Sequence, residues 1–380
     1  MRIRSVDAVH LRTTLERPFS FSQFSYTDRE TMLVKVATED GRTGWGEAYG
    51  PAAITAATVR EFLGPMIVGR DPRAVESLWA SMYARSIDYG QKGVLIAAMS
   101  ALDIACWDLK AQDAGVPLYR LLGSEPVESI ECYWTGFYFG GEEPLESRWE
   151  REAEECLEQG FHAVKMKVGL GVERDAELVG MLRGFVGSGC KLAIDANHAY
   201  SPIEAIDLAR RVEPHNIHWF EEPVSPLDAQ AYLDVKAATN IPLAGGECEY
   251  TRFGFQKWFD ARALDYAQPD VCACGGITES MKIATLASLA GIHVTPHVWG
   301  SAIGQAAALH FYAARPRQPF TLTPEAKLIE CDRTENPFRT EIVETPIRLD
   351  GGCWHLPEAA GLGIGVVPER FEPYLVGRVS

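Results

Sequence analysis

The chain has 380 residues, of which 47% are hydrophobic and 23% are charged, the balance of an ordinary soluble protein with a large core. Its length allows one large barrel with an added domain. The 52 acidic residues outnumber the 36 basic ones and give a formal charge of −16. Nucleic acids and anionic membranes bind basic surfaces, so this charge argues against both as partners.

The first residues alternate between apolar and polar side chains and contain no long hydrophobic run. Signal peptides and membrane-spanning helices need such a run, so we expect a cytoplasmic protein. The nine cysteines are odd in number and irregular in spacing, which is typical of reduced thiols. Cys272 and Cys274 are too close together for the usual zinc pair, and core packing is predicted for nearly all nine.

Residues 1–125 have the pattern of a small α+β domain. Strands are predicted at Ile3–Leu11, Thr31–Thr38 and Thr43–Glu47, with a turn at Asp40-Gly41 before the third. Helical periodicity follows over Ile54–Leu63, Arg73–Arg85 and Val94–Gln112.

Residues 126–340 repeat the order strand, turn, helix. The predicted strands are Ser129–Thr135, Ala163–Val168, Lys191–Asn197, Ile217–Glu221, Ile241–Gly245, Leu264–Gln268, His293–Thr295 and Phe320–Ile329. Helices are predicted between them, for example Arg148–Gln159, Arg174–Phe185, Pro202–Val212 and Ile277–Leu289. This alternation predicts parallel βαβ units closed into a (β/α)8 TIM-type barrel. Residues 341–380 are rich in Gly and Pro, and we expect them to return to the first domain.

A doubly wound sheet is the structural alternative. It would need a glycine-rich phosphate loop after an early strand, whereas Gly187-Ser188-Gly189 precedes one.

Three acidic residues recur once per βα repeat. Asp195, Glu221 and Glu247 stand at the ends of consecutive strands and are spaced 26 residues apart. Active sites in such barrels lie at the carboxyl ends of the strands, so the three carboxylates should converge. They would repel one another without a cation between them, and oxygen ligands of this kind favour Mg²⁺. Glu222 should point to the other side of its strand and be the weaker ligand.

Two lysines end the strand before Asp195. Lys165 and Lys167 are two positions apart and therefore face the same side. Two close ammonium groups lower each other's pKa, as burial also does, which makes one of them a candidate general base.

A second base is predicted on the far side of the ring. Asp270 and His297 follow neighbouring strands, 27 residues apart. A carboxylate hydrogen-bonded to an imidazole fixes its tautomer and raises its basicity. A divalent metal would stabilise the enediolate formed when the weakly acidic proton beside a carboxylate is removed. Two bases on opposite faces would allow removal of the proton, its replacement or loss of a leaving group.

These residues resemble the enolase superfamily, in particular its mandelate racemase subgroup, along essentially the whole chain. The motifs that carry the resemblance are Lys165-Met166-Lys167, Asp195-Ala196-Asn197, Glu221, Glu247, Asp270 and His297. The resemblance implies a modified barrel, (β/α)7β, with an N-terminal α+β capping domain. It also implies a homo-oligomer, a dimer or an octamer.

The same resemblance implies a role for each site residue. Asp195, Glu221 and Glu247 would hold one Mg²⁺, Lys167 would be one acid/base, and His297 with Asp270 the other. Lys165 would tune Lys167, and Glu330 would hydrogen-bond the oxygen of the intermediate. Substrate contacts are expected from Asn197, His198 and Trp299. The segment Arg17–Arg29 would form a mobile lid.

Several stretches are similar to the lactone cycloisomerases of the subgroup, among them Gly44-Trp45-Gly46-Glu47, Gln268-Pro269-Asp270, Pro296-His297-Val298-Trp299-Gly300 and Asp332-Arg333-Thr334. We therefore expect β-elimination from a small sugar acid or its lactone, as cycloisomerase or dehydratase. Two positions depart from the pattern. Glu249 would disfavour a second substrate carboxylate if it faces the pocket, and Trp134 stands where a small residue is usual.

Three alternatives stay open at this point. Racemisation or epimerisation by 1,1-proton transfer would use the same two bases. A barrel whose lysine forms a Schiff base would need no metal. A non-catalytic binding protein would be unaffected by loss of Lys167 or His297.

Overall fold

The computed structural model describes residues 1–316 and 328–376, and its first elements form a three-stranded antiparallel sheet. The strands, in the order β1-β2-β3, are Ile3–Ser20, Ser25–Thr38 and Thr43–Ala48. The pairing of β1 with β2 continues to Ser20↔Ser25. The expected lid loop over Arg17–Arg29 is therefore wrong in form, because only residues 21–24 lie outside strands.

The strand prediction stopped short because the far end of this hairpin is partly exposed on both faces. No alternation of apolar and polar residues marks it, and the ladder is held instead by backbone pairing and by ion pairs such as Arg12–Asp28, at 3.0 Å. The strands thus carry the hairpin well beyond the first domain.

Helices cover one face of the sheet. They are α1 (Ala52–Thr58), the π-helical η1 (Val59–Leu63), α2 (Gly64–Ile67), α3 (Val75–Ser86), α4 (Val94–Ala114) and the short α5 (Leu118–Leu121). The buried α4 approaches β3 so closely that a Cβ on Gly46 would lie 1.9 Å from Ala101 O. Glycine at this position permits the contact between helix and sheet.

The second sheet is a ring of parallel strands. In chain order they are β4 (Ser129–Thr135), β5 (Ala163–Lys167), β6 (Lys191–Asp195), β7 (Ile217–Glu221), β8 (Leu243–Gly245), β9 (Tyr266–Ala267), β10 (His293–Val294) and β11 (Leu328–Asp332). Neighbours pair from β4 to β10, and β11 pairs with β4. The predicted fold class, a modified (β/α)8 barrel with an N-terminal α+β part, is confirmed.

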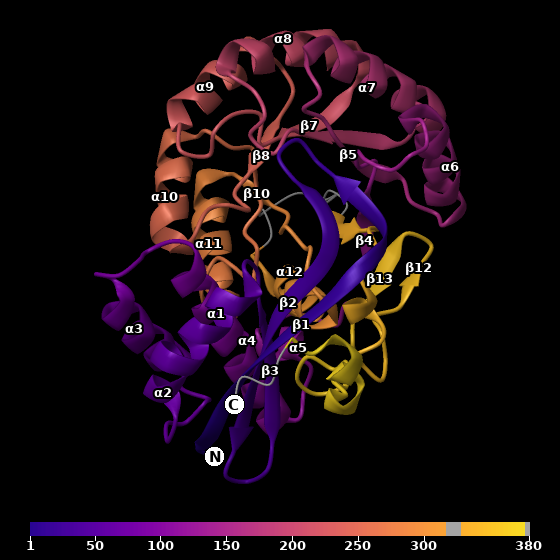
Figure 1. Cartoon of the computed structure of the whole chain (residues 1–380). Helices are drawn as coiled ribbons and strands as arrows, with labels where there is room; N and C mark the ends of the chain where they lie inside the picture. The colour runs from indigo at the N-terminus through magenta and orange to yellow at the C-terminus, as the bar shows by residue number, and fades with distance from the viewer. Residues whose placement is uncertain (317–327, 377–380) are drawn as a thin grey trace.

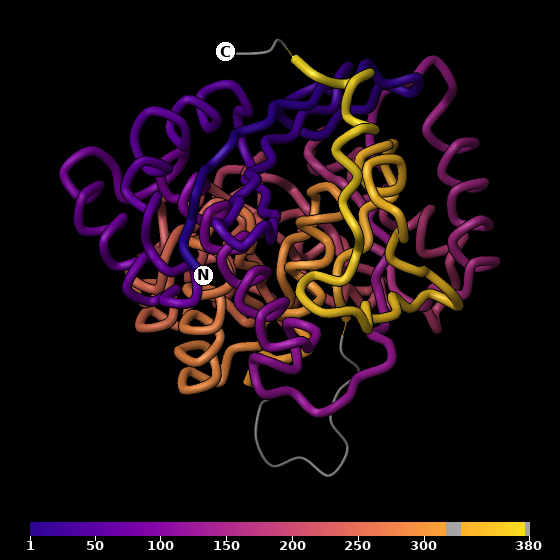
Figure 2. The backbone as a smooth tube through the Cα atoms, turned by 90° about the horizontal axis from the view of Figure 1, so that it is seen from below, coloured from indigo at the N-terminus to yellow at the C-terminus, as the bar shows by residue number. Residues whose placement is uncertain are grey.

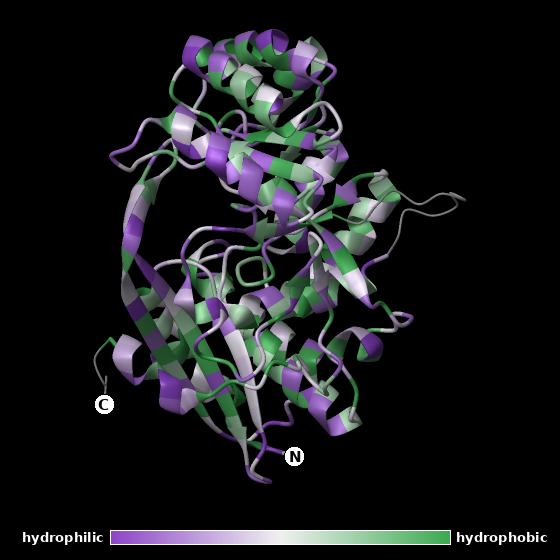
Figure 3. Cartoon of the chain, turned by 90° about the vertical axis from the view of Figure 1, so that its right-hand side faces the viewer, coloured by the Kyte–Doolittle hydropathy of each residue, from purple (hydrophilic) through white to green (hydrophobic). Residues whose placement is uncertain are grey.

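An outer layer of helices surrounds these strands (Figure 1). They are α6 (Leu145–Glu158), α7 (Val172–Val186), α8 (Pro202–Val212), α9 (Ala229–Ala238), α10 (Thr251–Ala261), α11 (Gly276–Ala290) and α12 (Ala302–Ala314), with a 3₁₀ turn η2 (Glu213–His215) after α8. In Figure 3 the helices at the top of the view carry interleaved polar and apolar residues, as expected where one face packs on the barrel.

The strands on the α9–α11 side are shorter than predicted. β8, β9 and β10 have three, two and two residues, so Glu247, Asp270 and His297 lie in the loops that follow them. Asp195 and Glu221, by contrast, are the last residues of β6 and β7. Most of the predicted strand Phe320–Ile329 lies outside the described residues, and β11 begins at Leu328.

The C-terminal segment contacts both parts of the chain. It contains η3 (Pro337–Arg339), β12 (Leu349–Asp350), β13 (Cys353–His355) and η4 (Pro368–Tyr374). β13 pairs with β4 of the barrel, while Val376 N donates to His10 O of β1 at 3.0 Å. Figure 2 shows this yellow segment running beside the indigo strands. The predicted bounds of the three parts, 1–125, 126–340 and 341–380, stay a prediction.

None of the helices in residues 1–316 and 328–376 has both the length and the apolarity to cross a membrane. The nine cysteines are free, seven are buried, including Cys272 and Cys274, and Cys248 is exposed.

Candidate active site

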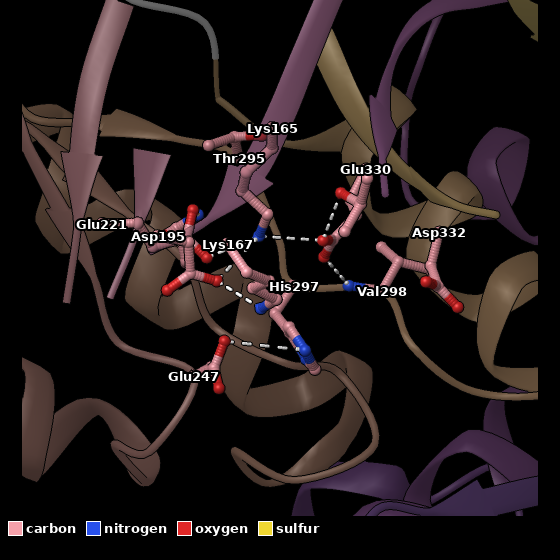
Figure 4. A network of polar contacts seen from close by, with 12 residues as sticks. Lys165, Lys167, Asp195, Glu221, Glu247, Thr295, His297, Val298, Glu330 and Asp332 are labelled. Atoms are coloured by element: carbon pink, nitrogen blue, oxygen red, sulfur yellow. Dashed lines mark hydrogen bonds and ion pairs between the residues drawn. The ribbon is translucent and has the colours of Figure 1, made fainter. Parts of the chain in front are cut away.

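Three carboxylates from consecutive βα units meet at the carboxyl ends of the strands. Oxygens of Asp195, Glu221 and Glu247 all lie within 4.8 Å of one another, and the first two side chains are buried. Figure 4 shows the three converging from β6, β7 and the loop after β8. Carboxylates this close are stabilised by a cation between them, and an all-oxygen set suits a hard divalent ion.

The two lysines of β5 reach this cluster side by side. Lys165 Nζ lies 2.5 Å from Glu221 Oε1 and 2.9 Å from Glu330 Oε1. Lys167 Nζ lies 2.5 Å from Asp195 Oδ2 and donates to Asn197 Oδ1 at 2.9 Å. Both lysines therefore face the same side, as their spacing predicted, and each has a separate carboxylate partner.

The prediction that the two lysines have lowered pKa values is wrong, because both ammonium groups contact carboxylates. Burial lowers the pKa of Lys167, and Lys165 lowers it further, but attraction to Asp195 and to the other carboxylates outweighs both effects, so the pKa is raised. The pKa of Lys165 is raised in the same way, against burial, chiefly by Glu221 and Glu330. The prediction considered the effects of the second lysine and of burial on each pKa, but not the attraction of the neighbouring carboxylates.

The predicted imidazole–carboxylate pair is present. His297 Nδ1 lies 2.6 Å from Asp270 Oδ2, and its Nε2 faces the cluster, 3.6 Å from Glu247 Oε2. Burial lowers the pKa of His297, but Glu247 and the hydrogen bond to Asp270 raise it to about 10. With Asp270 holding Nδ1, the nitrogen left to exchange a proton is Nε2.

Glu330 comes from the middle of β11. Its Oε1 accepts from Thr135 Oγ1 at 2.7 Å, and its Oε2 accepts from Val298 N at 2.7 Å. Burial raises the pKa of Glu330, but attraction to Lys165 and His297 lowers it by more. The net effect is a lowered pKa, which favours the carboxylate form. A carboxylate accepts hydrogen bonds only, so the predicted donation to an intermediate stays a prediction that requires a proton on Glu330.

A small cavity of about 30 Å³ lies at the centre of these groups. Six of its ten lining residues are predicted site residues, namely Lys167, Asn197, Glu247, His297, Trp299 and Glu330. The remaining four are aromatic: Phe21 and Tyr26 belong to the predicted lid segment, whereas Tyr49 and Tyr138 were not predicted. A larger cleft of about 470 Å³ lies on the other side of Tyr26, Tyr49 and Trp299.

The hairpin end closes this cavity. Phe21 and Tyr26 flank the turn between β1 and β2 and line the cavity. Ser22 Oγ donates to Ala196 O at 2.8 Å, and Gln23 Nε2 donates to Asn197 O. These two bonds hold the tip against the loop that follows the predicted ligand Asp195.

Three other predicted residues lie away from the cavity. His198 does not line it, and its Nε2 lies 3.2 Å from Glu222 Oε2 instead. Glu249 is buried and contacts Lys92 Nζ at 2.7 Å, so the idea that it repels a substrate carboxylate is not supported by its position. Trp134 is buried and donates to Glu152 at 3.0 Å, which is a packing role.

Comparison with known proteins gives the same assignment for both parts of the chain. Residues 3–123 match the family model described as "Mandelate racemase / muconate lactonizing enzyme, N-terminal domain". Residues 148–370 match the model described as "Enolase C-terminal domain-like".

Individual relatives are similar along nearly the whole length. D-galactarolactone cycloisomerase of Agrobacterium fabrum is 40% identical, covering 96% of this chain and 97% of its own. Arabinonate dehydratase of Saccharolobus solfataricus is 34% identical, covering 91% of this chain and 90% of its own. The crystal structure of a racemase from Streptomyces coelicolor with bound magnesium is 29% identical, with a TM-score of 0.88, covering 98% of this chain and 100% of that one.

Proposed function

The chain belongs to the mandelate racemase and muconate lactonizing enzyme family of the enolase superfamily, and we propose that it catalyses β-elimination from a sugar acid or a sugar-acid lactone. It is an enzyme of the isomerase or lyase type. The observation that carries the proposal is that Lys167, His297 and Glu247 line one cavity, while oxygens of Asp195 and Glu221 lie within 4.8 Å of an oxygen of Glu247.

Asp195, Glu221 and Glu247 are the residues that would hold Mg²⁺. Their oxygens form a compact all-oxygen group, with Lys165 and Lys167 close to Asp195 and Glu221 and His297 close to Glu247. The bound ion would offset the negative charge that develops on the substrate carboxylate as the neighbouring proton leaves.

Lys167 and the His297–Asp270 pair would act as acid and base. They come from β5 and from the loop after β10, which are separated by four strands along the ring, so they approach the cavity from different sides. Asp270 orients His297, and Asn197 orients Lys167. Lys165 is a positioning residue between Glu221 and Glu330.

The reaction balances with these groups alone. One base takes the proton from the carbon beside the carboxylate, and the electron pair forms a double bond to the β-carbon. The C–O bond at the β-carbon breaks, and the leaving oxygen receives a proton. In a lactone the ring opens; in an open acid water is lost. The enol then becomes the keto acid.

The test is incubation with a panel of aldonic and aldaric acids and their lactones in D₂O with Mg²⁺. We expect one member of the panel to give a 3-deoxy-2-keto acid. Product formation should stop when a chelator is added and resume when Mg²⁺ is restored. Deuterium in recovered substrate without any keto acid would instead favour 1,1-proton transfer. Turnover that persists with the chelator would overturn the metal assignment.

We also propose that the binding partner is this small acid or lactone, and that the chain acts as a homo-oligomer. The cavity supports the first point, because Lys167 and His297 among its lining residues can attract a carboxylate. It is smaller than a sugar acid, so the hairpin end must move for substrate to enter.

A further inference from the structure

A second cluster of metal-ligating side chains lies beside the candidate active site. His198, Glu222 and Cys248 follow β6, β7 and β8, and each stands one to three positions after a predicted Mg²⁺ ligand. One ligand atom from each lies within 4.8 Å of the other two. The group shares no residue with Asp195, Glu221 and Glu247.

Glu222 is the unusual member of this group. Its side chain is 1% exposed, and neither of its oxygens accepts a hydrogen bond from the residues that the structure describes. His198 Nε2 lies 3.2 Å from Oε2 without hydrogen-bond alignment. A buried carboxylate that accepts no hydrogen bond is costly to keep charged, and a bound cation would reduce this cost.

There is space for an ion next to this carboxylate. A cavity of about 10 Å³ is lined by Glu222 and Cys248, and His198 lies outside its lining but 3.2 Å from Glu222 Oε2. Cys248 is exposed, so an ion can reach the group from solvent.

The donor set selects the class of ion. Mg²⁺ prefers oxygen, whereas a thiolate, an imidazole and a carboxylate together favour Zn²⁺ and similar ions. With usual zinc bond lengths, tetrahedral ligands lie about 3.4 Å apart for nitrogen and oxygen and about 3.6 Å apart for nitrogen and sulfur. The observed separations are 3.2 Å for His198 Nε2 to Glu222 Oε2 and 3.6 Å for His198 Nε2 to Cys248 Sγ.

We propose that His198, Glu222 and Cys248 bind one thiophilic divalent cation of the zinc type, separate from the Mg²⁺ site. The three side chains supply three ligands, and the fourth position is open to water or to a further ligand. His198 does not line the substrate cavity, and metal binding would give this side chain a function. The proposal does not rest on the proposed catalytic function.

Cobalt binding tests the proposal on the full chain. The reduced protein, stripped of metal and then saturated with Mg²⁺, is titrated with Co²⁺ under anaerobic conditions. We expect one equivalent to give a sulfur-to-cobalt charge-transfer band, which oxygen ligands alone cannot give, and Zn²⁺ to abolish it. Cys248→Ser should lose the band, and the control Cys353→Ser, at a partly exposed thiol on β13, should keep it.

A second measurement avoids any dependence on variant folding. X-ray absorption at the zinc edge of the wild-type protein, loaded with one Zn²⁺ in excess Mg²⁺, should show one sulfur ligand among nitrogen and oxygen ligands. The absence of a sulfur ligand, or a cobalt band that survives Cys248→Ser, would overturn the assignment. Neither assay measures turnover, so failure here leaves the proposed elimination untouched.

Discussion

At the residue scale, Lys167 connects the proposed acid/base chemistry to the proposed metal ligands. Its ammonium group contacts both Asp195 and Asn197 and lines the cavity. Lys167→Met keeps the length of the side chain and removes the transferable proton. We expect kcat to fall by about 10²- to 10⁴-fold. Steady-state kinetics check this, with Lys257→Met, at an exposed lysine of α10, as the control. A change of kcat no larger than in the control would contradict the role.

Asp270 gives a prediction about pH. Its hydrogen bond contributes to raising the pKa of His297, after the larger contribution of Glu247 and against burial. An amide at this position keeps a hydrogen-bond partner but carries no charge. In Asp270→Asn the pKa of His297 should therefore fall, and the limb of the kcat/KM pH profile that reports His297 should move to lower pH.

The pH profile of Asp260→Asn, at an exposed position of α10, is the control for this change. An unmoved limb in Asp270→Asn would show that the limb does not belong to His297.

Some of these residues could be predicted from sequence because the βα repeat has a nearly constant length. Asp195, Glu221 and Glu247 are one repeat apart, so their convergence follows from barrel geometry. Tyr26 and Tyr49 line the same cavity but have no comparable spacing. Tyr26 lies on β2 and Tyr49 directly follows β3, and an aromatic residue at either position is equally well explained by packing. Their place depends on how far the hairpin reaches, which is a tertiary property.

At the element scale, strand lengths limited the prediction. Residues such as Ile241 and Leu264 are apolar and buried, so they extend the predicted strands although they do not pair in the barrel sheet. Glu247, Asp270 and His297 consequently lie on loops after very short strands. Their positions are fixed by local bonds, for example Cys272 N to Asp270 Oδ1 at 2.6 Å, that no periodic pattern encodes.

The hairpin of β1 and β2 provides the prediction at this scale. Its tip is held over the cavity by the bonds of Ser22 and Gln23 to backbone carbonyls at Ala196 and Asn197. The double variant Ser22→Ala/Gln23→Ala removes both. At about 1 kcal/mol for each hydrogen bond, we expect kcat/KM to fall by about 10- to 30-fold.

Thr13→Ala, lower on the same hairpin, is the matched control for kcat/KM. Equal effects of the two changes would mean that closure of the tip contributes nothing to substrate capture.

At the scale of the whole molecule, the site depends on how the first sheet joins the barrel. Part of this junction is formed by α4 and the start of α11, where Thr278 N and Oγ1 donate to Asp103 at 2.9 and 2.6 Å. Burial raises the pKa of Asp103 to about 7. The sequence predicted both parts, but not these contacts, because they join residues 175 positions apart without a shared pattern.

The second part of the junction is Glu47 of β3, which is 2% exposed. Its carboxylate accepts from Thr31 Oγ1 at 2.6 Å, from Ser301 N and Oγ, and from Gly304 N at 2.8 Å. It therefore satisfies amide groups at the start of α12, where the helix dipole favours a negative charge.

Removing this carboxylate should loosen the sheet from the barrel. Glu47→Ala leaves buried donors on Ser301 and Gly304 without an acceptor, and we expect a loss of about 2–4 kcal/mol of folding free energy. Urea unfolding followed by fluorescence measures the change, with Glu39→Ala, at an exposed position of the same domain, as the control. Because the hairpin that closes the cavity belongs to this sheet, kcat/KM should fall along with stability. A variant as stable as the control would show that other contacts suffice to hold the sheet on the barrel.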